Sequence, residues 1–133
     1  MTIAVALGEL EAAARERGPP AYILTVNERD TPHVVHAEVT IASEGLVLQV
    51  GARTVLHARH RPGVSLLYPC RTAADYSLIV DAMASVIPTR EGSQLLLTST
   101  RAVLHRPVPA PETAPSSCGA DCVPLLPPTR EGS

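Results

Sequence analysis

Apolar and polar side chains alternate along residues 32–43, and this pattern is the clearest structural signal in the chain. The apolar positions are Val35, Ala37, Val39 and Ile41, and the polar positions between them are His36, Glu38 and Thr40. A period of two is typical of a β-strand with one packed face. A second alternating run at 46–50 follows the Glu44-Gly45 pair, so the two runs predict a β-hairpin.

Four further segments predict strands. They are residues 21–27, the apolar run 64–67, the long run 75–87 and the last run 94–105. The run 64–67 is continuously apolar, which predicts burial on both of its faces. The run 75–87 is partly apolar on both faces, so we expect one face to lie against a partner subunit. Six strands at this spacing, joined mostly by hairpins, favour a small antiparallel barrel and a mainly β fold class.

Two segments have helical periodicity instead. Apolar residues at positions 3, 7, 10 and 14 form a stripe that predicts an amphipathic N-terminal helix over residues 2–17, ended by Gly18 and two prolines. Residues 53–61, between Gly51 and the Pro62-Gly63 pair, predict a short helix after the third strand. The exposed face of this short helix is expected to carry His57, Arg59, His60 and Arg61.

The chain of 133 residues fits one domain, which we place at residues 1–106. Seven of the thirteen prolines lie in residues 107–133, so this C-terminal segment is expected to be a Pro-rich tail without regular structure. The formal net charge of −2 argues against nucleic acid and anionic membranes as partners. Residues 1–7 are apolar but lack a basic leader, so we expect no signal peptide here. No apolar run approaches the roughly 20 residues needed to span a bilayer, so we expect a cytoplasmic protein.

Three cysteines are present, and two of them, Cys118 and Cys122, are separated by three residues. Zinc sites use such gaps but require four ligands, and no second close pair exists. Cys70 or His105 would have to complete a site, so no metal is expected and Cys118 and Cys122 are weak candidates. A disulfide between the two and free thiols both remain open.

Five segments, in this order and spacing, resemble the pyridoxamine 5′-phosphate oxidase-like flavoproteins of the split β-barrel family. They are PHVV at 32–35, GART at 51–54, RPGVSLL at 61–67, DYSLIV at 75–80 and LTSTRAV at 97–103. The resemblance covers residues 21–106. It implies a split β-barrel homodimer that binds flavin mononucleotide (FMN), or the deazaflavin F420, in a cleft between subunits. It also implies an oxidoreductase that acts on a small molecule.

The resemblance further implies which residues contact the cofactor. The family holds the cofactor phosphate at the turn that opens the short helix, which here contains Arg53 and Thr54. Arg53 is the expected anchor, Thr54 can donate a hydroxyl, and His57 adds charge if it is protonated. His36 and Glu38 are expected to border the ring system. No catalytic residue is assigned.

Two alternatives to a flavoprotein remain open. Ala52 and Thr54 stand where the family usually has a hydroxyl and a lysine, which favours a cofactor-less split-barrel dimer that binds small molecules or other proteins. The second alternative is a haem-binding relative, which would need a His or Cys ligand.

Overall fold

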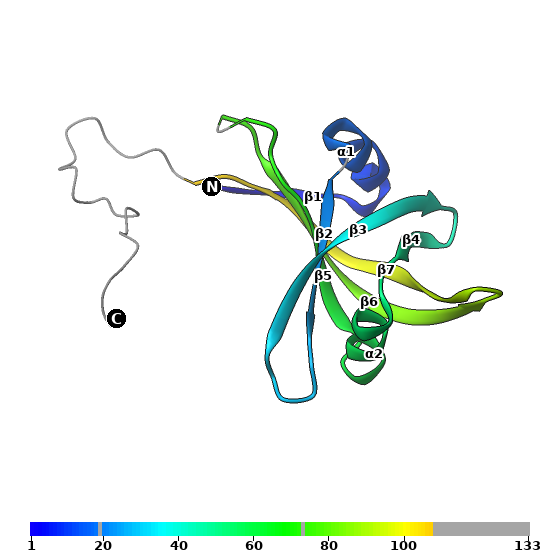
Figure 1. Ribbon diagram of the computed structural model, residues 1–133. Coiled ribbons are helices and arrows are strands. Elements are labelled where there is room, and N and C mark those ends of the chain that lie inside the picture. Colours follow the sequence, from blue (N-terminus) through cyan, green and yellow to red (C-terminus); the bar gives the residue numbers. More distant parts are fainter. Residues whose placement is uncertain (19, 73, 108–133) are drawn as a thin grey trace, which may run out of the picture.

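The computed structural model describes residues 1–18, 20–72 and 74–107 as a β-barrel with one helix at each end (Figure 1). The strands are β1 Thr2–Val5, β2 Ala21–Val26, β3 Pro32–Ala42, β4 Gly45–Gln49, β5 Gly63–Tyr68, β6 Ser77–Thr89 and β7 Gly92–His105. The helices are the 3-10 turn η1 Leu7–Glu9, α1 Leu10–Arg17 and α2 Ala52–His60. The remainder of the Pro-rich tail, with Cys118 and Cys122, lies outside the described residues.

The sheet closes on itself. Its strand order is β1-β7-β4-β3-β2-β5-β6, and a further pairing of β6 with β7 joins the two ends, so β2 to β7 make a six-stranded barrel and β1 extends one edge. All pairings are antiparallel. Closure satisfies the backbone groups that an open edge would expose. The predicted mainly β barrel is confirmed, with each predicted strand and the short helix within three residues of its observed bounds.

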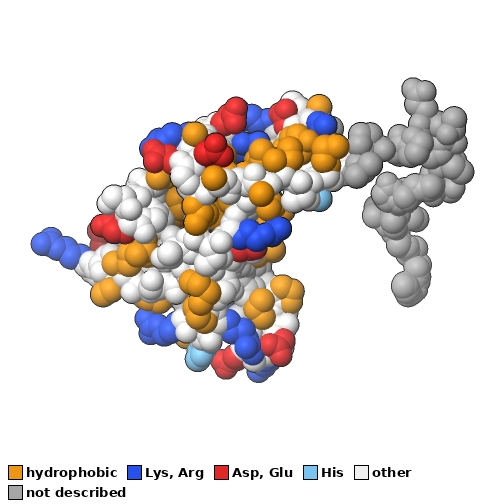
Figure 2. All heavy atoms as spheres, turned by 180° about the vertical axis from the view of Figure 1, so that it is seen from behind, with side chains coloured by type: hydrophobic (Ala, Val, Ile, Leu, Met, Phe, Trp, Pro, Cys, Tyr) orange, Lys and Arg blue, Asp and Glu red, His pale blue; other side chains and the backbone are white. Residues whose placement is uncertain are grey.

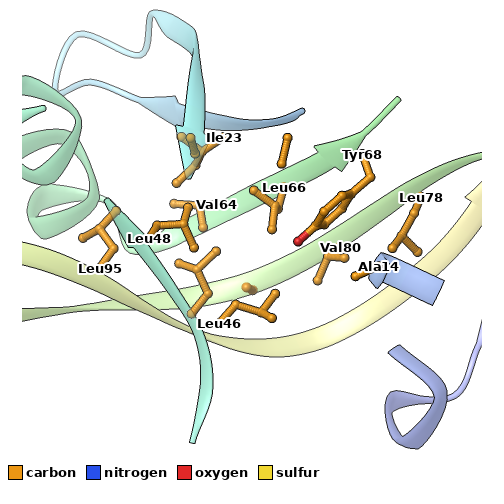
Figure 3. Packing of buried hydrophobic residues seen from close by; sticks show 14 of the residues in the cluster. Ala14, Ile23, Leu46, Leu48, Val64, Leu66, Tyr68, Leu78, Val80 and Leu95 are labelled. Carbon is orange, nitrogen blue, oxygen red and sulfur yellow. The ribbon is translucent and has the colours of Figure 1, made fainter. Parts of the chain in front are cut away.

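Alternation along the strands produces the core. Val64, Leu66 and Tyr68 of β5 point inward and are buried, and Leu78 and Val80 of β6 face them across the barrel interior (Figure 3). The outward residues of β5, including Leu67, are half-buried or exposed. The prediction that this run is buried on both faces was therefore wrong for the outer face. The core is aliphatic apart from Tyr68.

The N-terminal segment differs from the prediction of one long helix. Only Leu10–Arg17 is α-helical, because residues 2–5 pair with β7 in the register Thr2↔His105 to Val5↔Ala102. β7 is long enough to continue beyond the barrel, and its free edge offers backbone partners that outweigh the weak helical stripe. α1 buries Leu10 and Ala14 against the barrel, so the amphipathic helix is confirmed for the C-terminal half of the predicted range.

The helices α1 and α2 have 8 and 9 residues. Within residues 1–18, 20–72 and 74–107, none is both long enough and apolar enough to span a membrane.

Candidate functional site

The first turn of α2 presents a positive charge and free backbone donors. Gly51 precedes the helix in an extended conformation with no side-chain cap, and the first turn contains no acidic residue. The first backbone N–H groups of a helix have no partner within it. Arg53 is exposed and makes no ion pair or hydrogen bond to any described residue. Because this end of a helix is already electropositive, an unpaired arginine here is a site suited to an anion.

Two other residues predicted to contact the cofactor, Thr54 and His57, point into the protein. Thr54 is 6% exposed and His57 is 8% exposed. The His57 Nδ1 atom lies 3.3 Å from Oγ1 of Thr25, and the His57 ring packs against the ring of His33 with 4.6 Å between centroids. The prediction that His57 belongs to a solvated helix face was therefore wrong, whereas Arg59, His60 and Arg61 are exposed.

The surroundings of His57 also oppose its protonation. Burial lowers the pKa of His57 below its usual 6.5, and the nearby His33 and Arg53 lower the pKa further. His57 is therefore neutral near pH 7 and adds no positive charge beside Arg53. Whether Thr54 or His57 contacts a ligand stays a prediction, but both side chains are enclosed in this structure.

A hollow of about 690 Å³ lies between α1 and β3. Ala14 and Arg15 of α1 form one wall, residues 36–41 of β3 form the other, and Tyr68 at the end of β5 contributes to the floor. Small-molecule sites in proteins have volumes of about 300–1,000 Å³, so the size is suitable for a ligand. His36 and Glu38 are exposed on its rim, and the ring of His36 meets Tyr22 edge-on at 5.6 Å.

The structure therefore divides the predicted site residues into two groups. His36 and Glu38 line the hollow beside α1, whereas Arg53, Thr54 and His57 lie on α2 and do not line it. Sequence reasoning missed Tyr68, which is 5% exposed. A signal was available: Tyr68 has the same inward parity as Val64 and Leu66 and is one of only three aromatic residues in the chain.

Metal ligands do not gather in the part of the chain that the structure describes. No group of three or more His, Cys, Asp or Glu residues is placed there to hold an ion. Cys70, the one cysteine among the described residues, is exposed. The weak metal candidates Cys118 and Cys122 lie outside the described residues, so their role is untested.

The chain has relatives by sequence. An uncharacterised protein of Mycobacterium bovis and an uncharacterised protein of Mycobacterium tuberculosis are each 33% identical to it over 129 residues, covering 84% of this chain and 89% of the relative. No protein-family model matches the chain.

Solved structures share the fold at low sequence identity. A proposed pyridoxamine 5′-phosphate oxidase from Listeria innocua has a TM-score of 0.63 at 13% identity, covering 74% of this chain and 98% of its own. The FAD-binding protein of Mycobacterium smegmatis has a TM-score of 0.57 at 12% identity, covering 80% of this chain and 100% of its own. The haem storage protein HutZ of Vibrio cholerae has a TM-score of 0.57 at 16% identity, covering 73% of this chain and 92% of its own. The chain thus belongs to one family with the two mycobacterial proteins, and it has the split β-barrel fold of the pyridoxamine 5′-phosphate oxidase-like proteins.

Proposed function

We propose that this protein is a homodimeric oxidoreductase that binds a flavin-type cofactor, FMN or the deazaflavin F420, through the first turn of α2. The observation that carries the proposal is Arg53, an exposed guanidinium with no partner among the described residues, beside helix N–H groups that no side chain caps. The shared fold with an FAD-binding protein supports a cofactor of this class.

The residues at the start of α2 fit a phosphate group. A guanidinium can make two parallel hydrogen bonds to a phosphate, and the backbone N–H groups of residues 52–54 add donors of fixed direction. Flavins and deazaflavins supply electron or hydride transfer when bound, while the protein supplies binding and orientation. His36 and Glu38 line the hollow beside α1 and not this turn, so the proposal assigns them no contact with the cofactor.

The proposed dimer uses the outer face of the barrel. Val34 of β3 is 56% exposed and Met83 of β6 is 48% exposed, although both are large apolar residues. Both project from the outer face: Val34 is opposite Leu24 in the register, and Met83 borders a depression with Leu24 and Val26. Ser65 and Asp81 lie between these apolar positions on the outer face. Large apolar side chains left exposed in this way are typical of a subunit interface, and Figure 2 shows hydrophobic side chains at the surface on one side of the molecule.

A second candidate function is a split barrel that binds small molecules without a flavin. The observation in its favour is that Thr54, the residue with a side-chain donor next to Arg53, is only 6% exposed, while Ala52 on the other side of Arg53 provides no donor. A phosphate would then have one side-chain partner in place of the three that the family pattern provides.

Titration of the purified protein with FMN and with F420, followed by fluorescence, separates the candidates. We expect one of the two cofactors to bind. Arg53→Ala should lower the affinity for that cofactor at least about tenfold, as loss of a charge-assisted contact does. Arg59→Ala is the matched control, because Arg59 is an exposed arginine at the other end of α2. Binding of neither cofactor supports the second candidate, and a Soret band in the visible spectrum supports haem.

Sedimentation velocity tests the proposed interface. Val34→Asp is expected to convert a dimer into a monomer, because it buries a carboxylate without a partner. Leu56→Asp is the matched control, since Leu56 is 49% exposed but lies on α2. A wild-type monomer, or equal effects of the two changes, contradicts the interface.

A further inference from the structure

The floor of the hollow between α1 and β3 contains a polar group without a partner. Tyr68 is 5% exposed, and its hydroxyl makes no hydrogen bond to any described residue. Within residues 1–18, 20–72 and 74–107, Nε of Arg106 is the one fully enclosed side-chain nitrogen or oxygen that lacks a partner. The Tyr68 Oη atom therefore keeps some access to open space, and the hollow is the space that Tyr68 borders.

An unsatisfied hydroxyl in an apolar setting is unfavourable unless something occupies the space beside it. Figure 3 shows the Tyr68 ring held between Leu66, Val80 and Leu78, with Ala14 of α1 nearby, so the ring is fixed by apolar neighbours. Burial also raises the pKa of Tyr68 above its usual 10, so the hydroxyl is protonated at every physiological pH. The hydroxyl is therefore a fixed hydrogen-bond donor on a residue that lines the hollow.

The remaining lining determines the charge of a suitable ligand. Much of the wall is apolar, from Ala14 and Ala21 to Val39 and Ile41. The guanidinium of Arg15 is held by the carboxylate of Glu11, with two hydrogen bonds of 3.0 and 2.9 Å. The carboxylate of Glu38, on the opposite wall, makes no ion pair with any described residue. An anion would meet this free carboxylate and an arginine already paired with Glu11, so a neutral ligand is favoured.

We propose that the hollow between α1 and β3 binds a neutral, largely apolar carbonyl compound whose oxygen accepts a hydrogen bond from Oη of Tyr68. The apolar body of the compound packs against Ala37, Val39 and Ile41 of β3. The site is separate from the first turn of α2 and does not depend on a cofactor there. Charged rim residues stay in solvent, which is the usual arrangement of an apolar pocket with a single orienting polar group.

Three probes of matched shape test the proposal by calorimetry on the full chain: 2-acetylnaphthalene, 2-ethylnaphthalene and 2-naphthoate. The ketone is expected to bind about three- to tenfold more tightly than the hydrocarbon, the usual contribution of one neutral hydrogen bond. The carboxylate is expected to bind more weakly than the ketone. No binding of the ketone at millimolar concentration, or equal affinity for ketone and hydrocarbon, overturns the proposal.

Two variants place the binding in this hollow. Tyr68→Phe keeps the ring and is expected to abolish the preference for the ketone while leaving the affinity for 2-ethylnaphthalene unchanged. Tyr76→Phe is the matched control, because the Tyr76 hydroxyl donates to Sδ of Met1 outside the hollow. Val39→Phe fills the hollow and is expected to weaken both naphthalenes, which keeps the test decisive if Tyr68→Phe does not fold. Unchanged binding in Val39→Phe contradicts the location.

Discussion

The imidazole rings of His33 and His57 pack against each other with 4.6 Å between centroids and 39° between planes. One ring comes from β3 and the other from α2, so the contact joins the helix to the barrel. His57 also bonds Thr25 of β2, and Nε2 of His33 lies 3.3 Å from Nδ2 of Asn27. A polar chain thus crosses from the β2–β3 turn to the buried face of α2 and fixes the helix whose first turn carries Arg53.

Acidification should destabilise the protein through His57. Its folded-state pKa is lowered by burial, by His33 and by Arg53, so the unfolded chain takes up a proton at a pH where the folded chain does not. Stability is then greatest above about pH 6.5 and falls as the pH drops below that value towards the folded-state pKa. Urea unfolding between pH 8 and pH 5 measures the free energy of unfolding directly.

His57→Gln tests the assignment of this pH dependence. The substitution removes the titrating group, so the free energy of unfolding should vary less between pH 8 and pH 5 than in the wild type. His60→Gln is the matched control, since His60 lies on the same helix, is exposed, and faces Glu28 only at 4.0 Å. A profile that flattens in His60→Gln and not in His57→Gln contradicts the prediction.

Arg61, at the C-terminal end of α2, bonds to residues of the β2–β3 turn. Its Nε donates to the carbonyl oxygen of Asn27 at 2.9 Å, its Nη2 donates to that of Glu28 at 3.3 Å, and it pairs with Asp30 at 2.8 Å. The ion pair is exposed and contributes little, but the bonds to the carbonyls hold two elements together. Arg61→Ala should lower the free energy of unfolding by about 1–2 kcal/mol in urea, whereas Arg59→Ala should change it by less than about 0.5 kcal/mol.

Strand alternation and turn residues were sufficient to predict the barrel, because a period of two and a Gly or Pro break are local signals. Charged residues on neighbouring strands also pair across the barrel wall, since Arg101 of β7 lies 3.5 Å from Asp81 of β6. The first strand was missed because the positions of Ile3 and Leu7 fit a helical stripe as well. Only the distant edge of β7 decides between the two, and no local pattern reveals it.

The candidate site was harder to predict for the same reason. The exposure of Arg53 follows from its place in the first turn of α2, and the sequence indicated that turn. The burial of His57 depends on β2 and β3 residues that are 32 and 24 positions away, Thr25 and His33. The hollow forms where α1 packs near β3, and hydrophobic periodicity does not determine that packing. The sequence therefore could not show that His36 and Glu38 lie in a different site from Arg53.

Two turn glycines offer a matched pair of substitutions. Gly45 joins β3 to β4 with φ of 148°, and Gly92 joins β6 to β7 with φ of 140°, so both have a backbone that other residues rarely adopt. An added Cβ at Gly45 would overlap the carbonyl oxygen of Leu97, whereas one at Gly92 would meet nothing within 4 Å. Gly92→Ala should therefore cost about 1 kcal/mol from backbone strain alone.

Gly45→Ala should cost more, about 2–4 kcal/mol, because β4 must move away from β7 as well as adopt the strained backbone. Thermal and urea unfolding of the two variants provide the comparison. Since the backbone strain is common to both, the difference between them isolates the contact with Leu97. Equal losses of stability would show that β4 can shift without loss of packing.

Leu95 and Leu96 are successive residues of β7 on opposite faces of the barrel wall. Leu95 is fully buried, and Leu96 is half-buried on the outside. Leu95→Ala leaves a cavity among side chains from several strands and should lower the free energy of unfolding by about 2–5 kcal/mol. Leu96→Ala removes the same atoms at a site that water can reach and should cost about 1 kcal/mol or less. Both changes have the same effect on strand propensity. Equal losses in the free energy of unfolding, measured in urea, would therefore mean that the barrel interior is not the core.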